Sequence, residues 1–371
     1  MRITFVLPFY TTRPIGGLRV VYELANGLVK RGHSITIVHP RTLEGMALPN
    51  SLRARVARAL DRLYTLKGVT WMHVERGVQL THTANVTDAT IPAGDVIFAT
   101  NWHTAAPVLR LAEDKGRKYY LVQDFYPYLA PREVLESSWR SGFRIVCVST
   151  WLTEMVIAAG IRESNVATVS NGVSSVHSCS VPLPARNISI VMMYGNASYK
   201  AAEDGLRAIN RARNEFGEVP VRLFGPNFSR RPKALPDWAE YYPRLSEQGV
   251  SRLYNQSAIF VSSSLAEGFC LPAAEAMASG CAVVATDCGG IRDFAVDGAN
   301  ALLSEPGKPD QLAVNLLRVL RDGGLRERLA IEGLATMRNH TWDSAVVNLE
   351  ALLALNRSTG ETEVSHVASA S

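Results

Sequence analysis

Short apolar runs rich in β-branched residues alternate with helical stretches along most of this 371-residue chain. In its first half, the predicted strands are residues 3–7, 34–38, 69–74, 95–100, 118–123 and 143–149. Helical patterns lie between them, for example at residues 17–30 and 105–113. Alternation of this kind is typical of a parallel sheet built from βαβ units. We therefore expect an α/β, doubly wound domain in the first half.

The pattern stops at residues 170–186 and then starts again. This segment is rich in Ser, Pro and Gly and has no apolar period, which is typical of a linker. The predicted strands beyond it are residues 188–194, 219–224, 258–262, 282–285 and 301–303. We expect two Rossmann-like domains, residues 1–175 and 176–341, that face each other across a cleft. Residues 357–371 are small, polar and without a period, and we expect them to be disordered.

The composition excludes an integral membrane protein and a disulfide scaffold. No window reaches the ~18 consecutive apolar residues that a bilayer span needs. The five cysteines are odd in number and lack C-x-x-C spacing, so neither paired disulfides nor a zinc site is indicated. A cytoplasmic location fits these observations best.

Positive charge is concentrated in the first half of the chain. Residues 1–180 hold 20 Lys and Arg against 13 Asp and Glu, whereas the remainder holds 19 against 21. Much of the excess falls in residues 51–67, where apolar residues recur at helical spacing between four arginines. Such a helix suits either peripheral contact with an anionic inner membrane surface or packing on the sheet with a solvated arginine face. Nucleic-acid binding is not expected, because aromatic and basic residues are not interleaved.

Two adjacent glycines, Gly16 and Gly17, stand between the first predicted strand and an amphipathic helix. Glycines at a helix start let backbone N–H groups approach an anion, and the helix dipole favours negative charge there. A plain tight turn would explain the pair equally well. No third glycine completes the G-x-G-x-x-G fingerprint, which counts against a dehydrogenase.

The stretch SSSLAEGFCLPAAEAMASG in the second half places two carboxylates at the expected cleft. Pro272 suits the first turn of a helix, which would put Glu275 in that turn and Glu267 in the loop before it. Carboxylates so placed accept paired hydrogen bonds from vicinal hydroxyls, and Gly268 and Phe269 can offer backbone N–H groups. A sugar nucleotide suits this site.

This stretch resembles the donor-site signature of the retaining glycosyltransferases of family 4, E-G-F-x-L-P-x-x-E-A-M-A-x-G followed by a strand and Gly-Gly. The residues that carry the resemblance are Glu267, Gly268, Phe269, Leu271, Pro272, Glu275, Ala276, Met277, Ala278, Gly280, Gly289 and Gly290. It extends to Gly16 and Gly17, to residues 171–173 (NGV), and to Trp342. The resemblance implies a GT-B fold in which a C-terminal helix, residues 342–356, crosses back to the N-terminal domain.

What the resemblance implies about activity is transfer of a hexose or deoxyhexose from a nucleotide diphosphate sugar, with retention at the anomeric carbon. The acceptor would be a glycan, a lipid-linked sugar or a natural product. In the family the second glutamate holds the ribose and the first reaches hydroxyls of the transferred sugar, which are the roles of Glu275 and Glu267 here. Cys270 and Leu271 belong to the same donor-binding stretch. No metal and no other cofactor is expected, because the chain lacks a D-x-D pair.

The diphosphate contact departs from the family pattern. Lys200 matches the family's Lys, but Asn196 lies near the position of its Arg. The missing cation corresponds to about 1–3 kcal/mol of charged hydrogen bonding. Arg222, Arg230 and Arg231 are the candidates to replace it.

The acceptor side departs as well. Asp124 follows the fifth predicted strand, where many family members have a His that lies over the donor sugar. The surrounding VQDFYP sequence resembles the rhamnosyltransferases of the family. His103, at a predicted helix start after the fourth strand, is a second candidate, although a cap or packing role is commoner for such a residue. No carboxylate is a convincing nucleophile, which favours a front-face reaction.

Two other functions stay open. A sugar-nucleotide 2-epimerase would share the fold, but the full glutamate signature argues against it. A non-catalytic sugar-nucleotide binding protein would accommodate the missing Arg and His.

Overall fold

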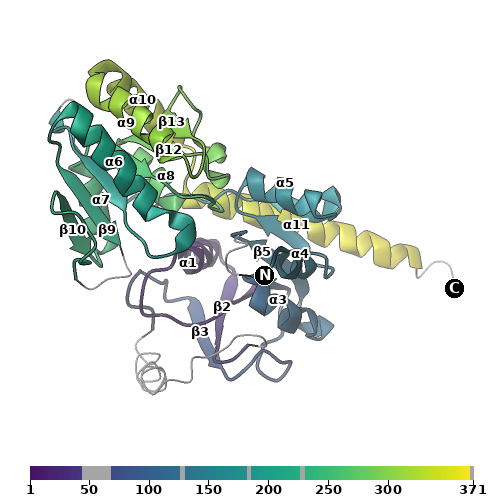
Figure 1. Ribbon diagram of the computed structural model, residues 1–371. Helices are drawn as coiled ribbons and strands as arrows, with labels where there is room; N and C mark the ends of the chain where they lie inside the picture. The colour runs from purple at the N-terminus through teal and green to yellow at the C-terminus, as the bar shows by residue number, and fades with distance from the viewer. Residues whose placement is uncertain (44–67, 126–129, 182–184, 226–229, 368–371) are drawn as a thin grey trace.

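The computed structural model describes residues 1–43, 68–125, 130–181, 185–225 and 230–367. The predicted basic helix at residues 51–67 lies outside this part of the chain. Figure 1 shows two α/β domains, with the C-terminal helix passing from the second domain across the first. No helix within the described residues combines the length and apolar character that a membrane crossing requires.

The N-terminal domain is built on a parallel sheet with strand order β3-β2-β1-β4-β5-β6-β7. Its strands are β1 (Arg2–Val6), β2 (Ser34–Pro40), β3 (Val78–Thr83), β4 (Val96–Ala99), β5 (Arg117–Val122), β6 (Arg144–Cys147) and β7 (Val166–Thr168). Its helices are α1 (Gly16–Lys30), α3 (Trp102–Leu109), α4 (Arg132–Trp139) and α5 (Thr150–Ala158). The order reverses between β1 and β4, so the loops that follow these strands lie at the switch point of the sheet, where open α/β sheets bind ligands.

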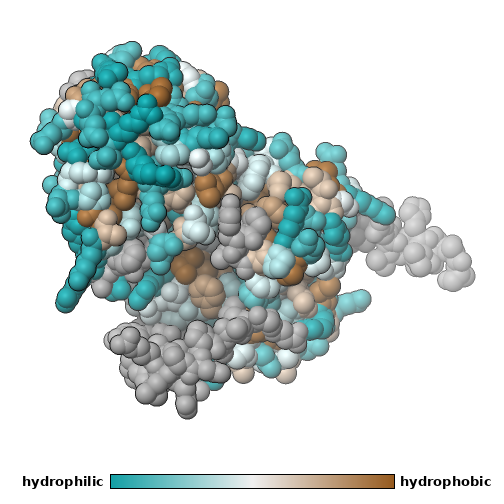
Figure 2. Space-filling view, viewed as in Figure 1, coloured by the Kyte–Doolittle hydropathy of each residue, from teal (hydrophilic) through white to brown (hydrophobic). Residues whose placement is uncertain are grey.

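The C-terminal domain repeats this plan with strand order β10-β9-β8-β11-β12-β13. Its strands are β8 (Ile190–Met193), β9 (Val221–Gly225), β10 (Ala239–Pro243), β11 (Ile259–Ser262), β12 (Ala282–Thr286) and β13 (Ala301–Ser304). Its helices are α6 (Ala202–Phe216), α7 (Glu247–Asn255), α8 (Leu271–Ala278), α9 (Pro309–Arg321) and α10 (Gly323–Met337). Figure 2 shows hydrophilic side chains over its outer helices, as expected for solvated faces.

The central strands are buried along their length, and this explains why they were predictable. Every residue of β4 and β12 is buried. Strands covered by helices on both faces lose the polar alternation of half-exposed strands and become continuous apolar runs. The core of the first domain continues into the second through Phe269, Phe294, Met337 and Trp342. The two domains are therefore joined by apolar packing as well as by polar contacts.

The predicted strand at residues 69–74 is wrong. The structure has no strand there, and the edge strand β3 begins later, at Val78. Val69, Trp71 and Val74 are apolar because they pack, partly buried, against the core from a loop. The short edge strands β7 and β10 were not predicted, because each carries a mixture of polar and apolar residues.

The C-terminal helix α11 (Trp342–Val367) returns to the first domain and packs against α1. Val346 is buried in this contact, and Glu350 pairs with Arg31 and with His33. The helix is assigned to Val367, and the expectation that residues 357–371 are disordered stays a prediction. In Figure 1 the end of α11 extends away from the body of the molecule.

The contact between α1 and α11 depends on Gly27. A Cβ atom at this position would lie 2.4 Å from Cγ2 of Val346. Glycine within a helix costs about 1 kcal/mol relative to alanine, so its presence here is explained by the close approach of the two helices.

We expect Gly27→Ala to destabilise the protein by about 1–2 kcal/mol, because overpacking outweighs the gain in helix propensity. In a Val346→Ala background the same substitution should be clearly less destabilising, because the 2.4 Å contact is then removed and only the Cβ atom of residue 346, at 3.2 Å, still lies close to the new methyl group. Urea unfolding of the four proteins in this cycle measures both values. An equal loss of stability in the two backgrounds would contradict this packing.

Candidate active site

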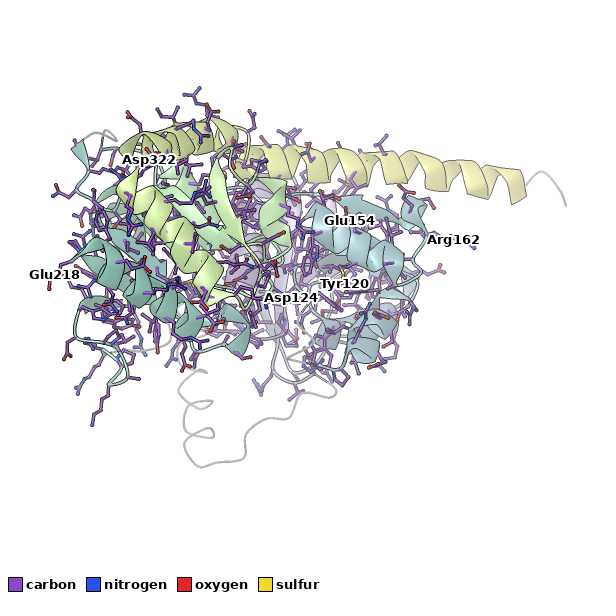
Figure 3. All side chains as sticks on the ribbon, turned by 45° about the horizontal axis from the view of Figure 1, so that its top comes forward. Tyr120, Asp124, Glu154, Arg162, Glu218 and Asp322 are labelled. Atoms are coloured by element: carbon purple, nitrogen blue, oxygen red, sulfur yellow. The ribbon has the colours of Figure 1, made fainter. Side chains whose placement is uncertain are left out.

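The loops at the carboxyl ends of the two sheets meet at the domain junction. A Cβ atom on Gly268 would lie 1.8 Å from the carbonyl oxygen of Gln123, so only glycine fits where the second domain touches the end of β5. A Cβ atom on Gly290 would in turn lie 2.1 Å from the carbonyl oxygen of Gly268. These glycines let the loops that carry Asp124 and Glu267 come together. Figure 3 shows Asp124 at this junction.

Lys200 and Glu267 form a buried ion pair in the second domain. The Nζ atom of Lys200 lies 2.6 Å from Oε1 of Glu267, and the hydroxyl of Ser264 donates to the same oxygen at 2.7 Å. Burial by itself would lower the pKa of Lys200, but the Glu267 carboxylate outweighs it and the pKa is raised above its usual range. Lys200 therefore carries a full positive charge at neutral pH.

The backbone around Lys200 is fixed to the loop that precedes Glu267. The N–H of Leu265 donates to the carbonyl of Tyr199 at 2.7 Å, and the hydroxyl of Ser263 donates to the carbonyl of Ala201 at 2.8 Å. Ala201 adopts a left-handed conformation, with φ of 42°, between a short 3₁₀ turn and α6. These contacts hold the ammonium group at the glutamate, 67 residues away along the chain.

The loop of Glu267 is also held from its other side. Its N–H donates to the carbonyl of Cys288 at 2.8 Å, and the N–H of Gly290 donates back to the carbonyl of Glu267 at 3.0 Å. The glutamate is 5% exposed. The Gly-Gly pair after β12 thus supports the first glutamate of the signature.

The segment between the two glutamates forms a tight turn into α8. Cys270 adopts a left-handed conformation with φ of 70° at the N-cap position, without a side-chain cap hydrogen bond. The helix begins at Leu271 with Pro272 in its first turn, as predicted. Glu275 is the fifth residue of α8, so it lies just beyond the first turn in which it was predicted. The ring of Phe269 is buried against Phe294, with ring centroids 5.3 Å apart.

Asp124 follows β5 on the first-domain side of the junction. Burial raises the pKa of its carboxyl to about 6, and the negative charge of Glu267 across the junction adds to the effect. A carboxyl with this pKa changes its protonation near the lower end of the physiological range. Asp124, which the resemblance places on the acceptor side near a family His that lies over the donor sugar, thus faces Glu267 across the junction, and its role stays a prediction.

Gly16 and Gly17 begin α1 beside the same junction. The helix has no side-chain cap and no acidic residue in its first turn, and a Cβ atom on Gly16 would meet no atom within 4 Å. A Cβ atom on Gly17 would lie 3.5 Å from Oε1 of Gln123. The N-terminal N–H groups of α1 are therefore placed at an uncapped end, as an anion contact requires.

Two other predicted residues, His103 and Asn196, are less closely connected to the pair of Lys200 and Glu267. The N–H of His103 donates to the Asn101 side chain at 3.1 Å in the cap of α3, and its ring lies 3.4 Å from that of Trp102, centroid to centroid. Asn196 is exposed in the loop after β8. His103 and Asn196 remain candidates only because each follows the carboxyl end of a strand.

The arginines proposed to replace the missing family Arg do not converge on the site. Arg222 lies near the start of β9, away from its carboxyl end, and donates to Ser189 and to the carbonyl of Gln256, both at 3.1 Å. Arg231 donates to carbonyls of its own loop, including that of Leu235. Arg230 is exposed. None of the three is shown to supply the second cation.

Sequence reasoning missed the surroundings of Glu275. Arg19 of α1 donates from Nη1 to Oε1 of Glu275 at 2.7 Å and also pairs with Glu247 at the start of α7. His177 of the linker lies with Nε2 3.6 Å from the same Oε1 atom. Arg19, Glu247 and His177 lie in separate segments of the sequence. None of them belongs to a motif, so no local sequence pattern predicted them.

The described residues contain no group of three or more His, Cys, Asp or Glu side chains arranged to hold a metal ion. The expectation that the reaction needs no metal stays a prediction.

Two family models match the chain, one for each domain. The model described as Glycosyltransferase Family 4 matches residues 15–176, and the model described as Glycosyl transferases group 1 matches residues 188–322. Two facing Rossmann-like domains with a returning helix form the GT-B architecture of glycosyltransferases. The chain belongs to glycosyltransferase family 4.

Individual relatives share only part of their sequence with the chain. O-antigen chain mannosyltransferase B of Escherichia coli is 30% identical over 107 residues, which are 29% of this chain and 28% of that protein. The matches span less than a third of the length of the first curated relatives.

Similarity to solved structures extends over both domains. Anabaena HepE in complex with UDP and glucose has a TM-score of 0.68 at 14% identity, over 95% of this chain and 99% of that one. A TarM variant of S. aureus, solved with Fondaparinux, alpha-GlcNAc-glycerol and UDP, has a TM-score of 0.71 at 11% identity, over 95% and 100%. At these identities the similarity shows the fold.

The raised pKa of Asp124 predicts a gain in stability for Asp124→Asn. The unfolded pKa is about 3.9 and the folded one about 6, so the folded state holds the proton more tightly. Stability therefore falls as pH rises from about 4 to 6 and stays lower above that range. We expect Asp124→Asn to be more stable than the wild type at pH 8, by about 3 kcal/mol at most, and to keep less of this advantage at pH 5.

Denaturant unfolding at pH 5 and pH 8 measures this difference. Asp237→Asn, at an exposed position, is the matched control and should change stability by less than about 0.5 kcal/mol at either pH. An equal advantage of Asp124→Asn at both values would show that the carboxyl is not destabilised by its surroundings.

Proposed function

We propose that this protein is a retaining, metal-independent glycosyltransferase that moves a hexose or deoxyhexose from a nucleotide diphosphate sugar to a glycan, lipid-linked or natural-product acceptor. The observation that carries the proposal is the buried pair of Lys200 and Glu267 beside Asp124 at the junction of two sheet edges. The pair supplies one cation for the leaving diphosphate and one carboxylate for sugar hydroxyls. Rhamnose is one candidate sugar, from the sequence around Asp124.

Lys200 suits stabilisation of the leaving group. Charge develops on the diphosphate as the bond to the anomeric carbon breaks, and a fixed ammonium in a water-poor site stabilises that charge more strongly than water does. When the donor binds, the ammonium can share its three N–H donors between Glu267 and a phosphate oxygen. The uncapped N-terminus of α1 at Gly16 and Gly17 would provide further donors from the other domain.

The reaction that fits these groups proceeds on one face of the sugar. The acceptor oxygen forms a bond to the anomeric carbon, the bond from that carbon to the diphosphate breaks, and the acceptor proton passes to a phosphate oxygen. No covalent sugar intermediate is required. Asp124 would orient the acceptor hydroxyl or stabilise positive charge on the sugar, and a covalent sugar adduct trapped on Asp124 would contradict this route.

The choice of donor base is supported by similarity of fold. The HepE and TarM structures are complexes that contain UDP. UDP is therefore the first nucleotide to test here.

Peripheral contact with an anionic membrane through residues 51–67 is part of the proposal, and sedimentation with anionic vesicles at low and high salt tests it.

A thermal-shift panel of UDP, dTDP, GDP and ADP should identify the base. The preferred nucleotide, at 100 times its dissociation constant, adds about 2.7 kcal/mol to stability and raises the melting temperature, whereas the others give smaller shifts. Incubation with the matching nucleotide sugars should then release nucleotide diphosphate slowly without acceptor. A nucleotide that binds without any turnover of its sugar derivatives would indicate a binding protein instead.

Lys200→Ala should lower the rate of donor turnover by about 10²–10³-fold, since the loss of one group that stabilises transition-state charge costs this much. Initial rates at saturating donor measure the change, and circular dichroism verifies that the variant is folded. Lys233→Ala, at an exposed position in the same domain, should keep wild-type turnover. A Lys200 variant with near-normal turnover would remove the basis of the proposed mechanism.

A further inference from the structure

Arg19 connects the two domains at the second glutamate of the signature. It lies near the start of α1, in the first domain, and its side chain is 17% exposed. Its guanidinium donates to Glu275 of α8 and to Glu247 of α7, both in the second domain. Its Nε atom also lies 3.7 Å from Glu23, one turn along its own helix. Arg19 thus pairs with three carboxylates.

The groups that face Glu275 come from every element packed around it. They are Arg19 and Glu23 of α1, Glu247 and Tyr254 of α7, and His177 of the linker. Burial lowers the pKa of His177 and raises that of Tyr254, so both are uncharged at neutral pH. Within this group the positive charge opposite the carboxylates is therefore that of Arg19.

A buried histidine, His177, lies beside the ion pairs of Arg19. Its side chain is 1% exposed, and Nε2 lies 3.6 Å from Glu275 and 3.7 Å from Glu247. Neither ring nitrogen has a hydrogen-bond partner among the described residues. Buried polar atoms are usually satisfied, so an imidazole left without a partner beside two carboxylates indicates a place where a further polar group binds.

We propose that Arg19 is a positioning residue for the donor, which holds Glu275 charged and directed at the nucleotide ribose and so makes the N-terminal domain part of the nucleoside site. This inference rests on the proposed function, in which Glu275 binds the ribose hydroxyls. Arg19 occupies one direction on Oε1, and a carboxylate has about four lone-pair sites, so hydroxyl donors can still be accepted.

In this proposal the guanidinium of Arg19 compensates the negative charge of Glu275 by direct contact. Without it, Glu275 and Glu247 are two poorly solvated like charges, and such a pair binds a proton more readily. A protonated carboxyl is a weaker acceptor for the paired ribose hydroxyls. Removal of Arg19 should therefore weaken nucleotide binding most at low pH, where Glu275 becomes protonated.

The experiment measures nucleotide affinity at two pH values. Isothermal titration at pH 6 and pH 8 uses the tightest-binding member of the UDP, dTDP, GDP and ADP panel. We expect Arg19→Met to weaken binding about 10–100-fold at pH 6, as the loss of a charged hydrogen bond implies, and clearly less at pH 8. Each value is compared with the wild type at the same pH, because the nucleotide itself titrates.

Three further variants separate positioning from a general structural effect. Arg19→Lys keeps the charge and should show a weaker affinity with the wild-type ratio between the two pH values. Glu275→Gln should lower affinity, and Arg19→Met should add no further loss in that background. Arg31→Met removes an exposed arginine at the C-cap of α1, which pairs with Glu350 of α11, and should bind nucleotide like the wild type.

Two outcomes would overturn the inference. One is a folded Arg19→Met protein with wild-type affinity at both pH values, and the other is a loss that Arg19→Lys shares with the same pH dependence. If instead the wild type binds no member of the panel, or Glu275→Gln binds as tightly as the wild type, the proposed function itself is at fault.

Discussion

The buried pair of Lys200 and Glu267 is the interaction on which the organisation of the site depends. Both groups lose hydration when they are buried, and their mutual attraction offsets this only because the geometry is close and Ser264 satisfies the same oxygen. Hydrogen bonds from Leu265 and Gly290 fix the two segments that carry the charges. A charged site is thus available before any ligand arrives, which reduces the reorganisation that binding and reaction require.

Much of the fold was predictable, because buried strands have a simple apolar sequence pattern. Strands covered on both faces, such as β1, β4 and β12, are short apolar runs, and the two series of such runs predicted two parallel sheets. The prediction was wrong where apolar residues serve another purpose. Trp71 and its neighbours pack from a loop, and the edge strands β7 and β10 are too mixed to be recognised.

The site was predictable only where its residues lie in one segment. Glu267 and Glu275 stand eight positions apart in a stretch that resembles a known family, and Lys200 could be added from the same resemblance. Arg19 and Glu247 carry no such signal. In sequence they are polar positions at the starts of two helices, and their meaning comes from a contact between domains more than two hundred residues apart. Long-range electrostatic partners of this kind become visible only in the structure.

The three carboxylates at the junction have different electrostatic surroundings. Glu267 lies against Lys200 and Glu275 against Arg19, so each of these two is paired with a cation. Asp124 faces Glu267, and burial with this like charge raises its pKa to about 6. The first two carboxylates are each held by a cation at a fixed position, while Asp124 can respond to charge that develops beside it. A positive charge that develops on the sugar would favour the ionised form of Asp124. The free energy that burial costs this carboxylate would then contribute to stabilisation of the transition state.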